Sequence, residues 1–175
     1  FRDAVAEGVL AWNKSFEKAG VKNAVQVKIQ PDDAKWDAGD IRYNVLRWTS
    51  SPTPPFGGYG PSFVNPKTGQ ILGADIMLEY VYFTNRVKYD KLFNPEALDL
   101  EPYFCQMGEY IHQENLLGAI STEIMSADEA AKKELVKESI IRLVLHEVGH
   151  TLGLNHNFKS SHLHNIEESH NAALT

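Results

Sequence analysis

The sequence lacks the features that mark several large classes of protein. Its 175 residues include one cysteine, Cys105, so no disulfide can form within the chain, and we expect this side chain to be a small buried hydrophobe. No apolar stretch approaches the length of a membrane span. Acidic residues outnumber basic ones by 23 to 17, and the net charge of −6 argues against nucleic acid and anionic membranes as partners.

Length and composition are those of one globular domain. Hydrophobic residues make up 43% of the chain, which is enough for a core, and charged residues make up an ordinary 23%. The chain starts at Phe1 rather than at a methionine and enters helical sequence at once. We therefore expect residues 1–175 to be a single domain fragment excised from a longer protein, with no signal peptide to read.

Hydrophobic periodicity divides the chain into strands in its first half and helices in its second. Helices are predicted over residues 1–19, 81–93, 103–119 and 127–152. Strands are predicted over residues 25–29, 41–48 and 71–80, with a proline- and glycine-rich surface loop over 50–69. This order predicts an α+β fold in which a small twisted mixed sheet packs on a long helix.

The most informative segment runs from His146 to His156 and reads H-E-x-x-H-x-x-G-x-x-H. On a helix that turns about 100° per residue, His146 and His150 lie about 40° apart, one turn from each other. Gly153 can adopt the left-handed conformation that ends a helix and turns the chain, so that His156 comes back to the same point. Three neutral imidazoles suit Zn²⁺ and leave its fourth position for water.

Glu147 lies beside these histidines, at an angle from which it can reach a metal-bound water without being a ligand. We therefore predict that Glu147 is the general base of a hydrolase and that His146, His150 and His156 are its metal ligands. The opposite side of the helix is apolar and is predicted to pack into the core; it carries Ile141, Val144, Leu145, Val148 and Leu152.

The full motif resembles the zinc signature of the metzincin metallopeptidases, glycine included. The likeness extends to large bacterial zinc-dependent metalloproteases and covers nearly the whole chain up to about residue 159. It rests upstream on Trp12-Asn13, Phe16, Ala19-Gly20, Arg42 to Trp48, Tyr59 to Ser62, Pro66, Thr68-Gly69 and Ala74 to Ile76, and downstream on Asn157-Phe158.

The resemblance implies a zincin-like fold with zinc as its cofactor and a peptide or protein as its substrate. It implies an edge strand along the cleft that pairs with extended substrate, for which residues 71–79 are the candidate. It also implies a periplasmic or extracellular location. Metzincins carry a methionine-bearing turn after the third histidine, whereas the last methionine here is Met125. We therefore expect that the fragment was cut before this turn, which would leave it weakly active or inactive.

The predicted function is that of a zinc-dependent endopeptidase, which hydrolyses peptide bonds with a metal-activated water. Two alternatives remain open: a zinc-containing binding module that has lost turnover, and a hydrolase of a non-peptide amide. The intact Glu147 argues against the first. A different ligand set, with Glu167 or Glu168 as third ligand, is disfavoured by the correct placement of Gly153 and His156. On the polar face of the strand at 71–80, Asp75 and Glu79 are predicted to be solvated surface residues, with contact to substrate as the alternative.

Overall fold

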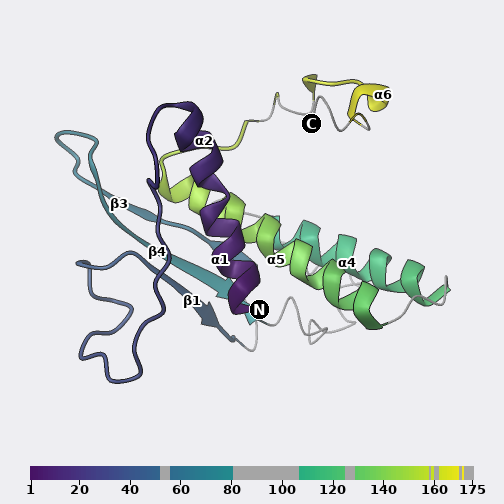
Figure 1. Ribbon diagram of the computed structural model, residues 1–175, viewed down its shortest axis with the longest axis horizontal. Coiled ribbons are helices and arrows are strands. Elements are labelled where there is room, and N and C mark those ends of the chain that lie inside the picture. Colours follow the sequence, from purple (N-terminus) through teal and green to yellow (C-terminus); the bar gives the residue numbers. More distant parts are fainter. Residues whose placement is uncertain are drawn as a thin grey trace, which may run out of the picture.

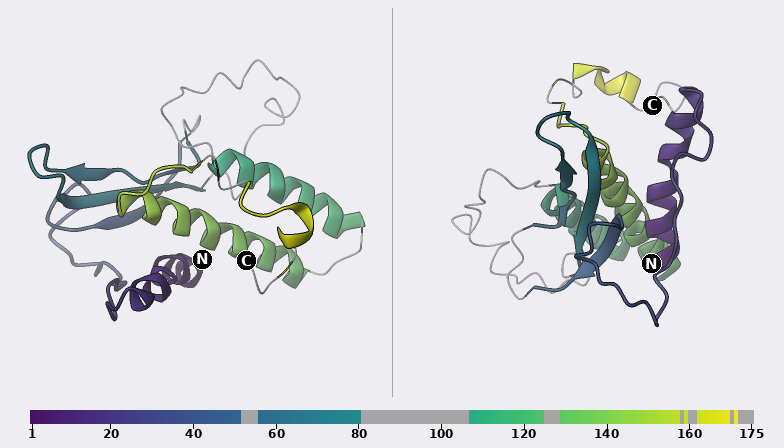
Figure 2. Two further views of the ribbon diagram at one scale, coloured as in Figure 1. Left: turned by 90° about the horizontal axis from the view of Figure 1, so that it is seen from above. Right: turned by 90° about the vertical axis from the view of Figure 1, so that its left-hand side faces the viewer.

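The computed structural model describes residues 1–51, 56–80, 107–124, 129–157, 159, 162–169 and 171. A mixed sheet lies against a long central helix, α5 (Glu129–Thr151), which also contacts the helices α1 (Arg2–Leu10) and α4 (Met107–Ile124) (Figures 1 and 2). The other helices in the described part of the chain are α2 (Trp12–Lys18) and the short α6 (Ile166–Ser169). This arrangement confirms the predicted α+β fold with a small mixed sheet on a long helix.

Within the described residues, the sheet has four strands: β1 (Val45–Thr49), β2 (Gly58–Tyr59), β3 (Ser62–Val64) and β4 (Ile71–Glu79). β4 pairs in parallel with β1 on one side and antiparallel with β2 and β3 on the other. The strand order is therefore β1-β4-β2, with β3 also paired to β4. The prediction that residues 71–79 form the edge strand is wrong, because β4 is central and β2 stands at the end of the order next to α5.

The predicted loop over residues 50–69 was also partly wrong, since it contains both β2 and β3. The prediction interpreted its glycines as residues of a surface loop, whereas Gly58 and Gly60 permit close contact between this segment and the neighbouring helix α5. The strand predicted at 41–48 begins later, at Val45, whereas the strand at 71–80 is confirmed almost to the residue.

No strand forms at residues 25–29, contrary to prediction. The side-chain amide of Asn13 takes both backbone groups of Val25: Nδ2 donates to its carbonyl at 2.9 Å, and Oδ1 accepts from its N–H at 2.9 Å. A neighbouring strand would need those same groups. The segment is extended but stays outside the sheet, and Ile29 is 70% exposed.

The helices are predicted well where they are described. The helix expected over residues 1–19 is present as α1 and α2, which meet at Ala11 in helical conformation. The long helix at 127–152 is confirmed as α5, and that at 103–119 is present as α4, which runs further, to Ile124. The helix predicted at 81–93 and Cys105 lie outside the described residues.

The core lies where α5 meets α1, α4 and β4. Its described members are buried apolar side chains: Ala4, Ile76, Leu78, Ile111, Ile140, Leu143, Val144 and Val148. Gly8 lets α1 approach α5, since a Cβ there would lie 2.9 Å from Val144. Two residues of the predicted apolar face, Leu145 and Leu152, are each 37% exposed, because α5 is covered by the sheet and α1 without being enclosed.

Candidate metal centre and its carboxylate

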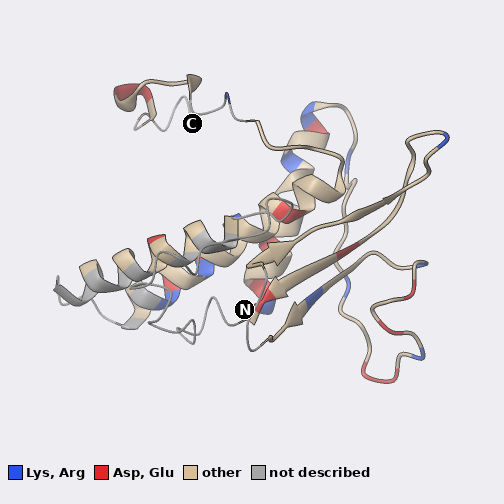
Figure 3. Ribbon diagram, turned by 180° about the vertical axis from the view of Figure 1, so that it is seen from behind, with Lys and Arg blue, Asp and Glu red and all other residues tan. Residues whose placement is uncertain are grey.

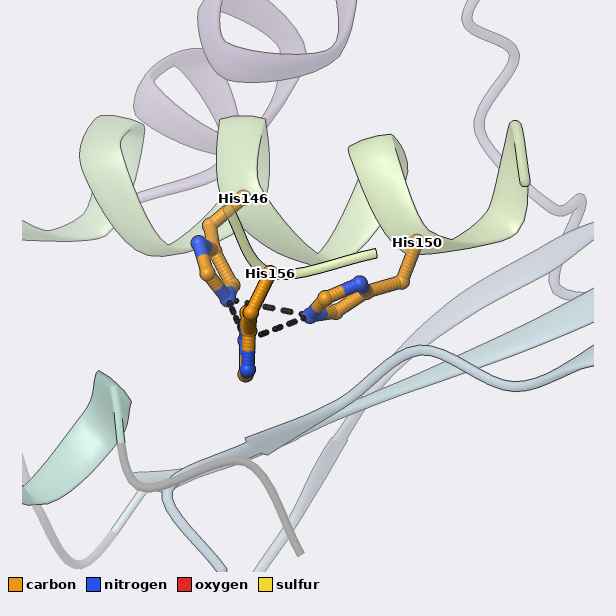
Figure 4. Close-up of side chains that lie close together, drawn as sticks. All are labelled: His146, His150 and His156. Atoms are coloured by element: carbon orange, nitrogen blue, oxygen red, sulfur yellow. Dashed lines mark hydrogen bonds between the residues drawn. The ribbon is translucent and has the colours of Figure 1, made fainter. Parts of the chain in front are cut away.

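Two of the three histidines of the motif project from the last turns of α5, and the third comes from the segment that follows it. Figure 4 shows that the rings of His146, His150 and His156 turn toward one point. Their Nε2 atoms are 3.0 Å apart for His146 and His150, 3.1 Å for His150 and His156, and 3.2 Å for His146 and His156. The structure thus brings all three predicted ligands together, and no other such cluster is present among the described residues.

A helix-terminating turn brings His156 back to the helix. The Gly153 N–H donates to the carbonyl of His150 at 2.9 Å, and the Leu154 N–H donates to that of Gly149 at 3.1 Å. This pair of bonds is the Schellman arrangement, which requires a left-handed residue after the helix. Gly153 has a φ of 93° and supplies that conformation, as the sequence predicted.

The orientation of His150 is fixed by a backbone carbonyl. Its Nδ1 lies 2.9 Å from the Leu154 oxygen, which can only accept, so Nδ1 must carry the proton and donate. The lone pair of a neutral ring is then on Nε2, the atom that faces the other two histidines. Such a bond from the distal ring nitrogen is the usual way in which proteins orient a metal-ligating histidine.

Electrostatics favour the neutral form of the His146 imidazole. Burial, together with the charges that His150, His156 and Arg142 would place nearby, lowers the pKa of His146 to about 4. His146 is therefore neutral at neutral pH and its ring can ligate a metal ion.

The donor set fits zinc. Ligand nitrogens about 2.0–2.1 Å from a tetrahedral zinc ion lie roughly 3.3 Å apart. The observed Nε2 separations of 3.0–3.2 Å are close to that value. Glu167 and Glu168 are in α6, outside this cluster, and the Glu168 carboxylate lies 3.8 Å from His164 instead.

Glu147 is fully buried, with 0% exposure, on the side of α5 that faces the sheet. Neither carboxylate oxygen has a hydrogen-bond partner of ordinary geometry. Burial raises the pKa of this carboxyl to about 7, and the nearby Gly60 N–H opposes the rise. A buried carboxylate with so little hydrogen bonding is an uncommon feature that calls for a functional explanation.

Two glycines, Gly58 in β2 and Gly60 just after it, lie in close contact with Glu147. A Cβ on Gly58 would lie 2.6 Å from Glu147 Oε1, and one on Gly60 would lie 2.5 Å from the Glu147 carbonyl oxygen. Real Cβ atoms do not approach so closely, so a larger residue at Gly58 would displace the Glu147 side chain or β2, and one at Gly60 would displace backbone. Sequence reasoning missed this contact, although the Gly57-Gly58-Tyr59-Gly60 run was a signal for close backbone approach.

Trp12 of α2 packs against the motif helix. Its indole Nε1 donates to the carbonyl of Leu145 at 3.0 Å. Its ring covers Gly149, where a Cβ would lie 3.1 Å from the ring edge. Gly149, which lies between His146 and His150 in the sequence, is thereby held against α2.

Comparisons with known proteins agree with this geometry where they find a match. Residues 128–175 match a family model described as Met-zincin. No curated protein and no solved structure matches the chain. The matched segment contains α5, α6 and all three histidines, and the cofactor of this family is zinc. The match agrees with the resemblance to metzincins that the sequence motif carries, and it covers residues 128–175 only.

Proposed function

We propose that this protein is a zinc-dependent endopeptidase in which His146, His150 and His156 hold the metal ion and Glu147 is the general base. The observation that carries the proposal is the convergence of three Nε2 atoms within 3.2 Å, with a buried carboxylate on the adjacent residue of the same helix. Bound zinc supplies a Lewis acid, which polarises a carbonyl group and makes water a stronger nucleophile near neutral pH.

The chain's own residues supply the proton transfers. One Glu147 oxygen accepts a proton from the water that attacks the scissile carbonyl, and then gives it to the nitrogen of the leaving amine. Burial favours this role, since a carboxyl with a pKa of about 7 can both accept and release a proton near neutral pH. His150 keeps its proton on Nδ1, bonded to the Leu154 carbonyl, and holds its ring still throughout.

An extended peptide is proposed to lie along the side of the sheet formed by β2 and β3. This replaces the candidate strand at 71–79, which is central in the sheet. The support for β2 is its place at the end of the strand order and its contact with α5, where Gly58 abuts Glu147. Backbone pairing of this kind accepts varied side chains, as a peptidase of broad specificity requires.

The test is substitution of Glu147 by glutamine in the zinc-loaded full-length protein. The shape of the side chain is kept while its basicity is lost, so kcat for peptide hydrolysis should fall by at least about 100-fold. Zinc content should not change, because Glu147 is not a ligand. Glu138→Gln, on an exposed position of the same helix, is the matched control and should retain activity.

Cleavage profiling on protein digests and on intact proteins, with a chelator control, distinguishes the remaining possibilities. Internal cleavage that the chelator abolishes supports an endopeptidase. Zinc uptake without any turnover would instead indicate a binding module, and hydrolysis confined to small non-peptide amides would indicate the other alternative. The periplasmic or extracellular location stays a prediction, to be checked by fractionating cells that make the full-length protein.

A further inference from the structure

A second buried carboxylate, Glu79, is not used by the chemistry proposed above. The sequence pattern predicted a solvated side chain, which is wrong: Glu79 is 1% exposed, at the end of β4. Its Oε1 accepts hydrogen bonds from Thr49 Oγ1 at 2.6 Å and Ser51 Oγ at 2.7 Å, and its Oε2 accepts from the Ser51 N–H at 3.1 Å. Three donors from one short segment compensate the cost of burying this group.

The backbone N–H of Glu79 binds a second residue of the connection between β1 and β2. Its N–H donates to the carbonyl of Gly57 at 2.9 Å. Ser51 and Gly57 are the two ends of the connection between β1 and β2. One residue therefore binds both ends, Ser51 through its carboxylate and Gly57 through its amide, and fixes where the chain enters β2.

Immediately after Gly57, strand β2 lies against Glu147. Gly58 is paired with Leu78, the neighbour of Glu79, and a Cβ on Gly58 would lie 2.6 Å from Glu147 Oε1. Leu78 faces the core, with 0% exposure, while the adjacent Glu79 side chain projects to the other face of the sheet. A shift of β2 by even a few tenths of an ångström would change the contact with the Glu147 carboxylate.

We propose that Glu79 is a positioning residue, which sets β2 against Glu147 and so fixes the orientation of the general base. The proposal rests on the function proposed for Glu147. Glu79 acts first through its hydrogen bonds to Ser51 and Gly57. Gly57 leads along the chain into β2, and β2 packs closely on Glu147 of α5.

The experiment compares three variants of the zinc-loaded full-length protein: Glu79→Ala, Glu79→Gln and the control Asp75→Ala. Asp75 is on the same face of β4, but its carboxylate pairs with Arg47 at 2.9 Å and not with the 51–57 connection. Glutamine keeps the size of the side chain and can bond both the Ser51 N–H and the two hydroxyls, which can donate or accept. It is therefore the rescuing variant.

The first readout is amide hydrogen exchange in residues 56–60 and at the Glu79 amide. Glu79→Ala should speed exchange there by at least about tenfold while residues 140–151 and zinc content stay unchanged. Glu79→Gln and Asp75→Ala should leave it near the original rate. If Glu79→Ala does not fold, Ser51→Ala, which removes one of the three bonds, should speed exchange at the same sites.

The second readout is catalysis. Glu79→Ala should lower kcat by about tenfold, with the zinc content intact, and Glu79→Gln should restore it. Unchanged exchange at 56–60, exchange that rises equally throughout the chain, or a loss of kcat that glutamine does not rescue would each overturn the positioning role. If the original protein hydrolyses no peptide, the endopeptidase proposal fails, and the exchange measurements still decide whether Glu79 sets the position of β2.

Discussion

At the scale of single residues, the site depends on what surrounds each side chain rather than on the side chain alone. His150 ligates through Nε2 because its Nδ1–H donates a hydrogen bond to the Leu154 carbonyl. Glu147 carries a raised pKa because the sheet and two glycines remove it from water. The fixed residue types of the motif reveal neither effect, since Leu154 occupies a variable position within it and Gly58 and Gly60 come from another segment.

Gly58→Ala tests the close contact between β2 and the Glu147 carboxylate. The added Cβ would meet Oε1 at 2.6 Å, so either β2 or the carboxylate must move, and we expect a loss of about 1–3 kcal/mol in the free energy of unfolding. Peptidase activity should fall as well, because the base is displaced. Denaturant unfolding and kcat measurements check both effects.

Gly73→Ala is the matched control for that substitution. Gly73 is on the adjacent strand β4, where a Cβ would make only ordinary contacts, the nearest at 3.4 Å from the Ile41 carbonyl oxygen. It should retain stability and activity. Equal effects of the two substitutions would show that the contact with Glu147 has no special importance.

At the scale of elements, helix α5 and the turn after it assemble the three imidazoles. Periodicity and the motif were sufficient to predict this helix, its end and the left-handed Gly153, because helix formation and termination are local properties of the chain. The pairing of strands is not local. The strand at 71–80 was found, but its central place in the sheet depends on β2 and β3, which were hidden in a glycine-rich segment.

The difference between local and non-local interactions also explains the other incorrect predictions. Val25 alternates with polar neighbours as a strand does, yet the Asn13 side chain, 12 residues away, occupies its backbone groups. Glu79 has the polar residue type of a solvated face, yet Thr49 and Ser51 surround it. Each outcome was decided by a partner that no short pattern contains.

Gly153→Ala tests the turn, and Gly20→Ala is its matched control. Both glycines follow a helix with positive φ, 93° and 89°, so alanine should cost each about 1–2 kcal/mol of stability. Only Gly153 determines the path to His156. Zinc affinity, measured by competition with a chromophoric chelator, should fall for Gly153→Ala and stay constant for Gly20→Ala. Equal zinc affinities would contradict the role assigned to the turn.

At the scale of the whole molecule, α5 is shared between the core and the metal centre. Its sheet-facing and α1-facing sides supply core residues such as Leu143 and Val144, while its last turns supply two ligands. Charges of both signs are interspersed along the described ribbon (Figure 3). Within the described part of the chain, no helix has the length and apolar character needed to cross a membrane.

Zinc removal should therefore weaken the fold as well as the chemistry. An ion that binds only the folded chain adds about 2.7 kcal/mol of stability when its free concentration is 100 times the Kd. We expect a chelator to lower the Tm and added zinc to restore it. The variant His146→Ala/His150→Ala should show no response to either, and a full response from that variant would place the stabilising ion elsewhere.

The central claim is that three imidazole nitrogens of this chain bind one zinc ion. X-ray absorption spectroscopy at the zinc edge, on the full-length protein loaded with one equivalent of zinc, tests it most directly. We predict a low-coordinate site with three imidazole ligands at about 2.0–2.1 Å, reduced to two in His156→Ala. A site of oxygen ligands only, a spectrum that His156→Ala does not change, or failure to retain zinc would contradict the account.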